Sequence, residues 1–319
     1  MNRIATRELS MVIALVAIWA FFAWQQPVFL SARNLSLLSV ELAITAVLAL
    51  GMLVVLLPGQ IDLSAGSGVG LAGAVAAVLV FWHDVPAPIA LLIATLGAVL
   101  VWSAMGALIA VERIPAFIMT LGGLLVFRGL HWLVIENQTV PVVVGGSQNV
   151  YSLLTTYYLP EVAGYVLAGL AVTAIVATAL VARKRRQSYG FPVDDGEITF
   201  LKLFALAQMV FLVVIVTNGY RGIPIALVIL GLVAVLVHQL VTNTPFGRYL
   251  YAIGGNEEAA VVSGVPVRNT IIGAYALMGG IVALTGFMQT AYSGASTSTV
   301  GSLMELDAVA ACVIGGTSL

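Results

Sequence analysis

The chain has 319 residues, of which 61% are hydrophobic and only 8% are charged, and its formal net charge is -1. A soluble domain carries charge on about a quarter of its residues, so this composition excludes an ordinary water-soluble enzyme. The near-neutral charge also provides no basic surface for nucleic acid.

Long stretches without charge indicate a membrane protein. No Asp, Glu, Lys or Arg occurs in residues 42–61, 85–111 or 269–304. About 20 apolar residues, at 1.5 Å rise per residue, cross a hydrocarbon core as a helix, whereas open strands would leave backbone groups unpaired in lipid. The sequence therefore predicts an all-α, polytopic membrane bundle of nine to ten transmembrane helices. The segments are residues 9–25, 36–57, 63–82, 86–111, 115–135, 161–182, 201–217, 223–242 and 270–291, and a tenth begins near 304.

The first segment is interpreted as a retained helix. Arg3 and Arg7 precede an apolar run, as in a signal peptide, but Gln25, Gln26 and Pro27 follow it in place of a small-residue cleavage site.

The basic residues predict the orientation. If the segments alternate sides, ten Lys and Arg residues lie on the side of the N-terminus, two lie on the opposite side, and Arg128 lies within a segment. Because basic residues favour the cytoplasmic side, we expect a cytoplasmic N-terminus. The first set is Arg3, Arg7, Arg113, Arg183, Lys184, Arg185, Arg186, Lys202, Arg248 and Arg268, and the second is Arg33 and Arg221.

Two loops stand out between the predicted segments, and the first is interpreted as a linker between two halves of the chain. The basic run at residues 183–186 opens a predicted cytoplasmic loop, residues 183–200, in which the basic cluster fixes the orientation or binds anionic lipid or a partner. The longest outer loop, residues 136–161, is long enough to form a lid or a docking surface.

A break interrupts the apolar sequence at residues 58–68, where a proline, three glycines and a carboxylate occur. Asp62 or Ser64 can cap the following helix by accepting hydrogen bonds from its free N–H groups. A broken helix with polar groups also suits a substrate path. The glycines that follow predict close helix packing, and so does a second group in the ninth segment. These positions are Gly66, Gly68, Gly70 and Gly73, and then Gly279, Gly280 and Gly286.

Four ionisable residues lie within segments: Glu41, Arg128, His131 and His238. Each is costly in hydrocarbon and should face protein or water. A proton relay is one interpretation, but no chain of carboxylates runs through successive helices, and Arg128 and His131 lie near the outer end of their segment, where snorkelling is easy.

The cytoplasmic loop at residues 243–269 mixes aromatic, charged and small residues. Asn256 is placed to cap a short helix, with Glu257 and Glu258 at its positive end and Gly264 closing it. These helix start and stop residues favour a partner-docking surface over a plain interfacial loop.

The motifs of several enzyme classes are missing. Lys184 and Lys202 are the only lysines and neither follows a glycine, so the chain has no phosphate loop and is not itself a Walker-type ATPase. The three histidines are too scattered to predict a metal site, and the single Cys312 lies in an apolar run, where it serves as a small hydrophobic residue.

The sequence resembles the permease subunits of bacterial ABC importers for monosaccharides, the ribose and xylose group, and is most similar to xylose permeases. The resemblance covers nearly the whole chain from residue 30. It is carried by LSARN (30–34), GQIDLS (59–64), IPAFIMTLG (114–122), FRG (127–129), the block at 246–264 and ELDAVAACVIGGTSL (305–319).

The resemblance implies an ABC importer permease fold in the bacterial inner membrane, with residues 1–319 forming one transmembrane permease domain. It implies no cofactor in this chain, with ATP and Mg²⁺ on a separate ATPase subunit. The other implied partners are a periplasmic sugar-binding protein, a second permease copy or a homologue of it, and membrane lipid. It places the ATPase-coupling contact at Gly255, Asn256, Glu257, Glu258, Ala259, Ala260, Ser263 and Gly264.

The resemblance also suggests a substrate path lined by Asp62, Ser64, Phe117 and Thr120, because a sugar needs hydroxyl partners beside an apolar or aromatic wall. Helix packing is the alternative role for Phe117. Two departures stand out. Glu41 replaces an uncharged polar residue, and the chain stops at Leu319 inside a conserved block, so we expect it to be truncated at the C-terminus.

The leading hypothesis is a transport subunit that moves a monosaccharide, a pentose such as xylose, and has no catalytic residues of its own. A proton- or sodium-coupled secondary transporter is the alternative, suggested by Asp62 in a broken helix and by Glu41. A membrane scaffold without flux is a third.

Overall fold

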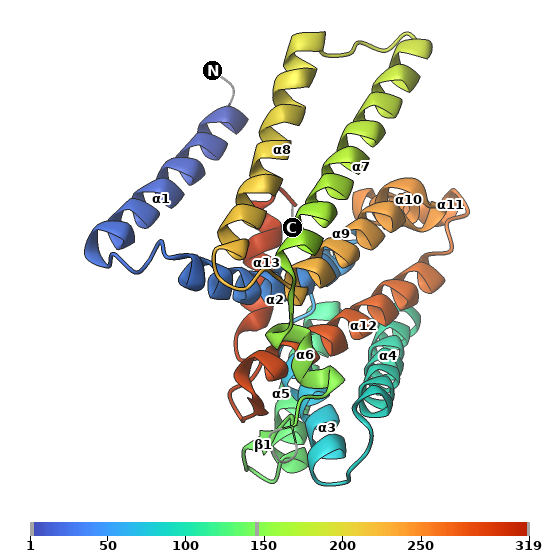
Figure 1. Ribbon diagram of the computed structural model, residues 1–319. Coiled ribbons are helices and arrows are strands. Elements are labelled where there is room, and N and C mark those ends of the chain that lie inside the picture. The colour runs from blue at the N-terminus through green and yellow to red at the C-terminus, as the bar shows by residue number, and fades with distance from the viewer. Residues whose placement is uncertain (1–2, 144–146, 318–319) are drawn as a thin grey trace. The chain divides into compact units, whose positions relative to one another are not determined.

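The computed structural model describes residues 3–143 and 147–317, and nearly all of its elements are helices (Figure 1). The long helices are α1 (Arg3–Gln25), α2 (Ala32–Leu56), α3 (Ala65–Phe81), α4 (Ala87–Glu112), α5 (Ala116–Val134), α7 (Glu161–Ser188), α8 (Gly196–Asn218), α9 (Ile225–Asn243) and α12 (Val267–Ser293). The short helices are α6 (Val150–Thr156), α10 (Pro245–Gly255), α11 (Glu257–Val262) and α13 (Met304–Ile314).

Two small antiparallel strand pairs join loops that are distant in the sequence. β1 (Val140–Pro141) pairs with β4 (Ala295–Ser296), and β2 (Tyr158–Leu159) pairs with β3 (Ile223–Pro224). The predicted outer loop at residues 136–161 is therefore partly ordered by strands and by α6.

Seven helices in the described part of the chain are long and apolar enough to cross a membrane: α2, α4, α5, α7, α8, α9 and α12. This confirms a mostly helical protein with several candidate membrane spans. The other predicted segments are also helical but shorter. The apolar part of α1 is Ser10–Gln25, α3 has 17 residues, and α13 has 11 residues and begins at Met304. At 1.5 Å per residue α3 is about 25 Å long, which is a little less than the ~30 Å of a hydrocarbon core.

The chain divides into two compact units, Met1–Ser39 with Tyr158–Pro224, and Val40–Tyr157 with Ile225–Leu319. The first unit contains the helical hairpin of α7 and α8, which lie side by side in Figure 1. Helix α7 continues through the basic run to Ser188 and α8 starts at Gly196, so most of the predicted cytoplasmic loop 183–200 is helical.

Polar contacts hold the end of this hairpin together. Arg183 donates hydrogen bonds to the Thr199 hydroxyl and to the carbonyl oxygen of Asp195. The hydrogen bond from Lys202 Nζ to Asp194 Oδ2, 2.6 Å long, lowers the pKa of the Asp194 carboxyl. Both side chains of this ion pair are more than half exposed, so the pair adds little stability.

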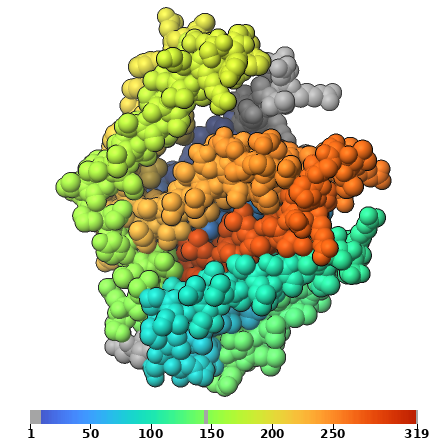
Figure 2. All heavy atoms as spheres, turned by 90° about the vertical axis from the view of Figure 1, so that its right-hand side faces the viewer, coloured from blue at the N-terminus to red at the C-terminus, as the bar shows by residue number. Residues whose placement is uncertain are grey.

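The core of the second unit is built on α12, which packs along α4 and α3, while α3 also packs on α5. In Figure 2 the teal α4 and the orange-red α12 lie side by side on the face toward the viewer. Glycines allow these helices to approach closely. A methyl group at Gly279 would lie 2.7 Å from the carbonyl oxygen of Ala98, and one at Gly73 would lie 2.7 Å from that of Gly286. Both glycine groups therefore serve close packing, as the sequence predicts, except that Gly280 makes only an ordinary contact with Val99.

Candidate functional site

The break between α2 and α3 is organised by the Asp62 carboxylate, which is fully buried. Its Oδ1 accepts hydrogen bonds from the Ser64 backbone N–H at 2.8 Å and from the Ser64 hydroxyl at 2.5 Å. Its Oδ2 accepts one from Trp102 Nε1 on α4 at 2.7 Å. Asp62 thus satisfies a free N–H next to the start of α3, as expected of a cap, and it also joins the break to a second helix.

The sequence predicts Asp62 or Ser64 as the cap, and of the two only the Asp62 side chain accepts a hydrogen bond from a backbone N–H at this end of α3. Ser64 precedes the first helical residue, but its hydroxyl accepts no capping hydrogen bond. The physical reason is the stronger acceptor two residues earlier, because the Ser64 hydroxyl donates to the Asp62 carboxylate instead.

Thr120 fastens α5 to the same break. Its hydroxyl is buried and donates to the carbonyl oxygen of Ile61 at 3.1 Å, and Gly123, one turn further along α5, lies against Ser64. Three of the four predicted substrate-path residues, Asp62, Ser64 and Thr120, therefore gather in one place. Phe117 does not join them, since its side chain is 53% exposed.

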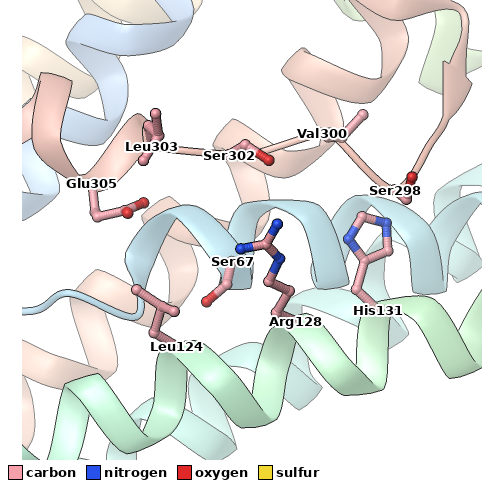
Figure 3. Close-up of a pocket in the computed structure, with 10 residues that line it drawn as sticks. Ser67, Leu124, Arg128, His131, Ser298, Val300, Ser302, Leu303 and Glu305 are labelled. Carbon is pink, nitrogen blue, oxygen red and sulfur yellow. The ribbon is translucent and has the colours of Figure 1, made fainter.

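A polar pocket of about 330 Å³ opens between α3, α5 and the segment that leads into α13 (Figure 3). In Figure 3, Arg128 and His131 point from α5 toward this segment, and the carboxylate of Glu305 points into the pocket from the opposite side. The lining residues are Ser67, Leu124, Arg128, His131, Ser298, Val300, Gly301, Ser302, Leu303 and Glu305.

Close packing against α3 fixes two of these side chains. A methyl group at Gly66 would overlap Oε2 of Glu305, and one at Gly70 would lie 2.7 Å from Nδ1 of His131. His131 is buried, with Nε2 3.3 Å from the Ser296 hydroxyl, so the expectation that it snorkels toward water is wrong. Arg128, one turn earlier, is exposed.

The predicted coupling loop contains two capped helices. The Thr244 hydroxyl caps α10 by accepting from the Gly247 N–H, and Asn256 Oδ1 caps α11 by accepting from the Ala259 N–H at 2.9 Å. Glu257 and Glu258 occupy the first turn of α11. Gly264 follows the helix with a φ of +80°, a conformation that glycine adopts without strain. The predicted cap, acidic first turn and closing glycine are confirmed.

This loop is exposed on one side and packed on the other. Among the predicted coupling residues, Ala260 is buried, and the other seven are exposed: Gly255, Asn256, Glu257, Glu258, Ala259, Ser263 and Gly264. Figure 2 shows this orange segment at the right-hand edge of the molecule. At the end of α10, Gly254 is so close to the carbonyl oxygen of Leu57 that a side chain would not fit. The loop therefore contacts the chain segment that carries Asp62.

A groove of about 760 Å³ adjoins α11. Its polar lining comes from Gln60, Arg113, Glu257 and Glu258, and its apolar lining includes Val262. Val262 is 89% exposed, so α11 presents both acidic and apolar groups at its surface.

The remaining ionisable residues do not form a relay. Glu41 and His238 are exposed on α2 and α9. Within residues 3–143 and 147–317, no group of three or more His, Cys, Asp or Glu side chains is placed to hold a metal ion.

The sequence did not predict the roles of two residues in these sites, Trp102 and Glu305. Trp102 lies in a charge-free segment and is 40 positions from its partner Asp62. The sequence indicated only that a buried indole N–H or carboxylate needs a hydrogen-bond partner. It did not identify that partner.

Comparison with known proteins gives a consistent result. The family model for the permease component of branched-chain amino acid transport systems matches residues 34–319. The xylose transport system permease protein XylH of Escherichia coli K12 is 37% identical over 310 residues, which cover 97% of this chain and 78% of that protein. XylH of Haemophilus influenzae is 39% identical over 313 residues, covering 97% and 82%. The ribose import permease protein RbsC of E. coli K12 is 29% identical over 312 residues, covering 98% and 78%. No solved structure matches the chain.

Proposed function

The chain belongs to the family of permease components of branched-chain amino acid transport systems, and on this basis we propose that it is the membrane permease of an ATP-driven importer for a monosaccharide, with xylose as the first candidate. The observation that carries the proposal is the match to xylose permeases over 97% of the chain. The chain is a multi-pass inner-membrane protein and a transport component rather than an enzyme.

The proposed topology adds detail to the seven membrane-length helices. We propose nine to ten spans with the N-terminus in the cytoplasm, in which α1, α3 and α13 complete the set. Support comes from the helices present at each predicted segment and from the ten-to-two distribution of basic residues.

We propose that transport is powered by a separate ATPase subunit, which binds ATP and Mg²⁺ and docks on α11. Glu257, Glu258 and Val262 offer it an exposed mixed surface, and Gly254 transmits the contact to Leu57 at the break. Nucleotide would bind one arrangement of the complex better and so shift the population between inward-open and outward-open states. A periplasmic sugar-binding protein and a second permease copy complete the proposed assembly.

The substrate path at Asp62, Ser64, Phe117 and Thr120 stays a proposal. In the present conformation Asp62, Ser64 and Thr120 are fully buried, so they would line a path only in a second state of the break.

No observation favours the ion-coupled alternative. Glu41 is exposed on α2, and both oxygens of the Asp62 carboxylate accept hydrogen bonds from Ser64 and Trp102.

The test is reconstitution in proteoliposomes with the cognate ATPase and binding protein. We expect xylose uptake that requires ATP and stops when the ATPase carries a hydrolysis-dead substitution. Uptake that continues with the dead ATPase, or that an ion gradient drives without nucleotide, would refute the proposal.

The coupling contact is tested separately with Glu258→Ala combined with Gly264→Ala. We expect this double variant to insert normally but to lose association with the ATPase. Full transport by the double variant would disprove the coupling role of α11.

A further inference from the structure

The pocket in Figure 3 carries two opposite charges that face each other without pairing. Arg128 lies on α5 and Glu305 on α13, and both line the pocket. In the described part of the chain neither of them forms an ion pair.

Such an arrangement is costly unless a partner is present. The Glu305 side chain is only 6% exposed, and a buried carboxylate needs donors to replace water. Its contact with Gly66, in the first turn of α3, places it near the positive end of that helix, which offsets part of the cost. Arg128 is exposed on α5, so its guanidinium is accessible to a polar ligand in the pocket.

The charges of the pocket disfavour ligands that carry charge of one sign only. Glu305 would repel an anion that Arg128 attracts, and Arg128 would repel a cation that Glu305 attracts. A neutral polyol suits both residues, because each hydroxyl can donate to the carboxylate and accept from the guanidinium. A zwitterion also matches the two charges, and the similarity to xylose permeases favours the polyol.

The other lining groups fit the same ligand. The Ser67 hydroxyl donates to the carbonyl oxygen of Ser64 and offers an acceptor, and the Ser298 and Ser302 hydroxyls provide further donors and acceptors. Leu124 and Leu303 provide apolar walls. A volume of about 330 Å³ lies at the lower end of the range of small-molecule sites, about 300–1,000 Å³.

We propose that this pocket is a binding site for the transported monosaccharide, in which Glu305 accepts hydrogen bonds from ring hydroxyls and Arg128 donates to them. The inference rests on the proposed function, because it takes the neutral polyol to be the transported sugar. It adds residues outside the break at Asp62.

The first experiment measures occupancy without transport. Ser298→Cys is introduced into a chain carrying Cys312→Ala, since Cys312 is the single native cysteine. The permease, assembled with its ATPase in nanodiscs, is labelled with a small charged thiol reagent with and without xylose. Thr299→Cys is the matched control, because Thr299 is exposed in the same loop and does not line the pocket.

We expect saturating xylose to slow the labelling of Ser298→Cys severalfold and to leave Thr299→Cys unchanged. Inorganic phosphate should protect neither position. Protection of Ser298→Cys by phosphate but not by xylose, or equal labelling of it with and without xylose, overturns the proposal.

The second experiment measures uptake by Glu305→Gln and Arg128→Gln in proteoliposomes, with Asp307→Asn as the control. Asp307 is an exposed carboxylate two residues along α13 and does not line the pocket. Loss of one charged hydrogen-bond partner should lower uptake at limiting sugar about tenfold or more, while the control changes little. Basal ATP hydrolysis by each purified complex verifies assembly.

The two failures can be told apart. If the unmodified complex shows no ATP-dependent xylose uptake, the proposed function is wrong. If the unmodified complex transports xylose, and assembled Glu305→Gln and Arg128→Gln transport it equally well, the pocket proposal is wrong and the proposed function stands.

Discussion

Trp102 Nε1 donates a hydrogen bond to Asp62 Oδ2 at 2.7 Å, and this contact joins the broken segment before α3 to the middle of α4. Both residues are buried, and the Asp62 carboxylate has no cationic partner in the described part of the chain. The donors of Ser64 and Trp102 therefore stabilise the charge of the Asp62 carboxylate. The loss of either donor should lower the stability of the protein.

Trp102→Phe tests this dependence. Phenylalanine keeps the aromatic contact with Phe127, whose ring centroid is 4.9 Å away, but it removes the N–H donor. A hydrogen bond to a charged group is worth about 1.5–3 kcal/mol, so we expect a clear drop in the apparent melting temperature of the purified protein. Trp132→Phe is the control, because Trp132 is 50% exposed on α5. Equal melting temperatures for the two variants would show that the contact contributes nothing.

Gly286→Ala tests the packing of α12 on α3. A methyl group at Gly286 would overlap the carbonyl oxygen of Val69 and lie 3.0 Å from the backbone nitrogen of Gly73. Because backbone atoms cannot move aside cheaply, we expect a loss of about 1–3 kcal/mol, measured as a lower apparent melting temperature.

Gly97→Ala is the matched control for that variant. Gly97 also lies within a helix, but nothing is within 4 Å of its added methyl group. We expect no loss of stability, because alanine favours a helix over glycine. Comparable losses at both positions would mean that general helix sensitivity, rather than the contact, explains the result.

Asn256→Ala tests the cap of α11. The substitution removes the acceptor for the Ala259 N–H, at a cost of about 1 kcal/mol to a helix of 6 residues that is marginal on its own. We expect weaker binding of the ATPase subunit, measured by titration of the labelled permease. Asn256→Asp retains a capping oxygen and should restore most of the affinity. If Ala and Asp bind the ATPase equally, the cap does not matter for docking.

Tyr151→Phe tests how α6 is held on α3. The buried Tyr151 hydroxyl donates to the carbonyl oxygen of Gly73 at 2.9 Å. Removing it should cost about 1 kcal/mol of stability. Tyr165→Phe, at a 40% exposed position on α7, should cost almost nothing. A thermal shift assay on both variants decides the point, and identical curves would contradict the assignment.

Local patterns carried the sequence predictions that the structure confirms. Hydropathy located the membrane helices because about 20 apolar residues are needed to cross a bilayer. The cap of α11 followed from Asn256, two acidic residues and Gly264 within nine positions. The glycine groups predicted close packing because glycine has no Cβ atom. Two helix backbones can therefore approach each other where glycines lie at the contact.

The contacts that the sequence did not predict depend on which partner a side chain finds. Ser64 can donate or accept, and only the neighbouring Asp62 decides that it donates. Phe117 belongs to a helix that is apolar almost all round, so the sequence does not determine which face points inward. Glu305 and Ser67 are more than 200 positions apart, and only the fold brings them to one pocket.

The close contact of α3 with α12 has a further consequence for the route of a solute. Where Val69, Gly73 and Gly286 meet, there is no space for an additional methyl group, and therefore none for water or a sugar. In this conformation the contact between α3 and α12 admits no solute. A solute that crosses the second unit must therefore pass elsewhere than through this contact, or pass in a conformation in which α3 and α12 separate.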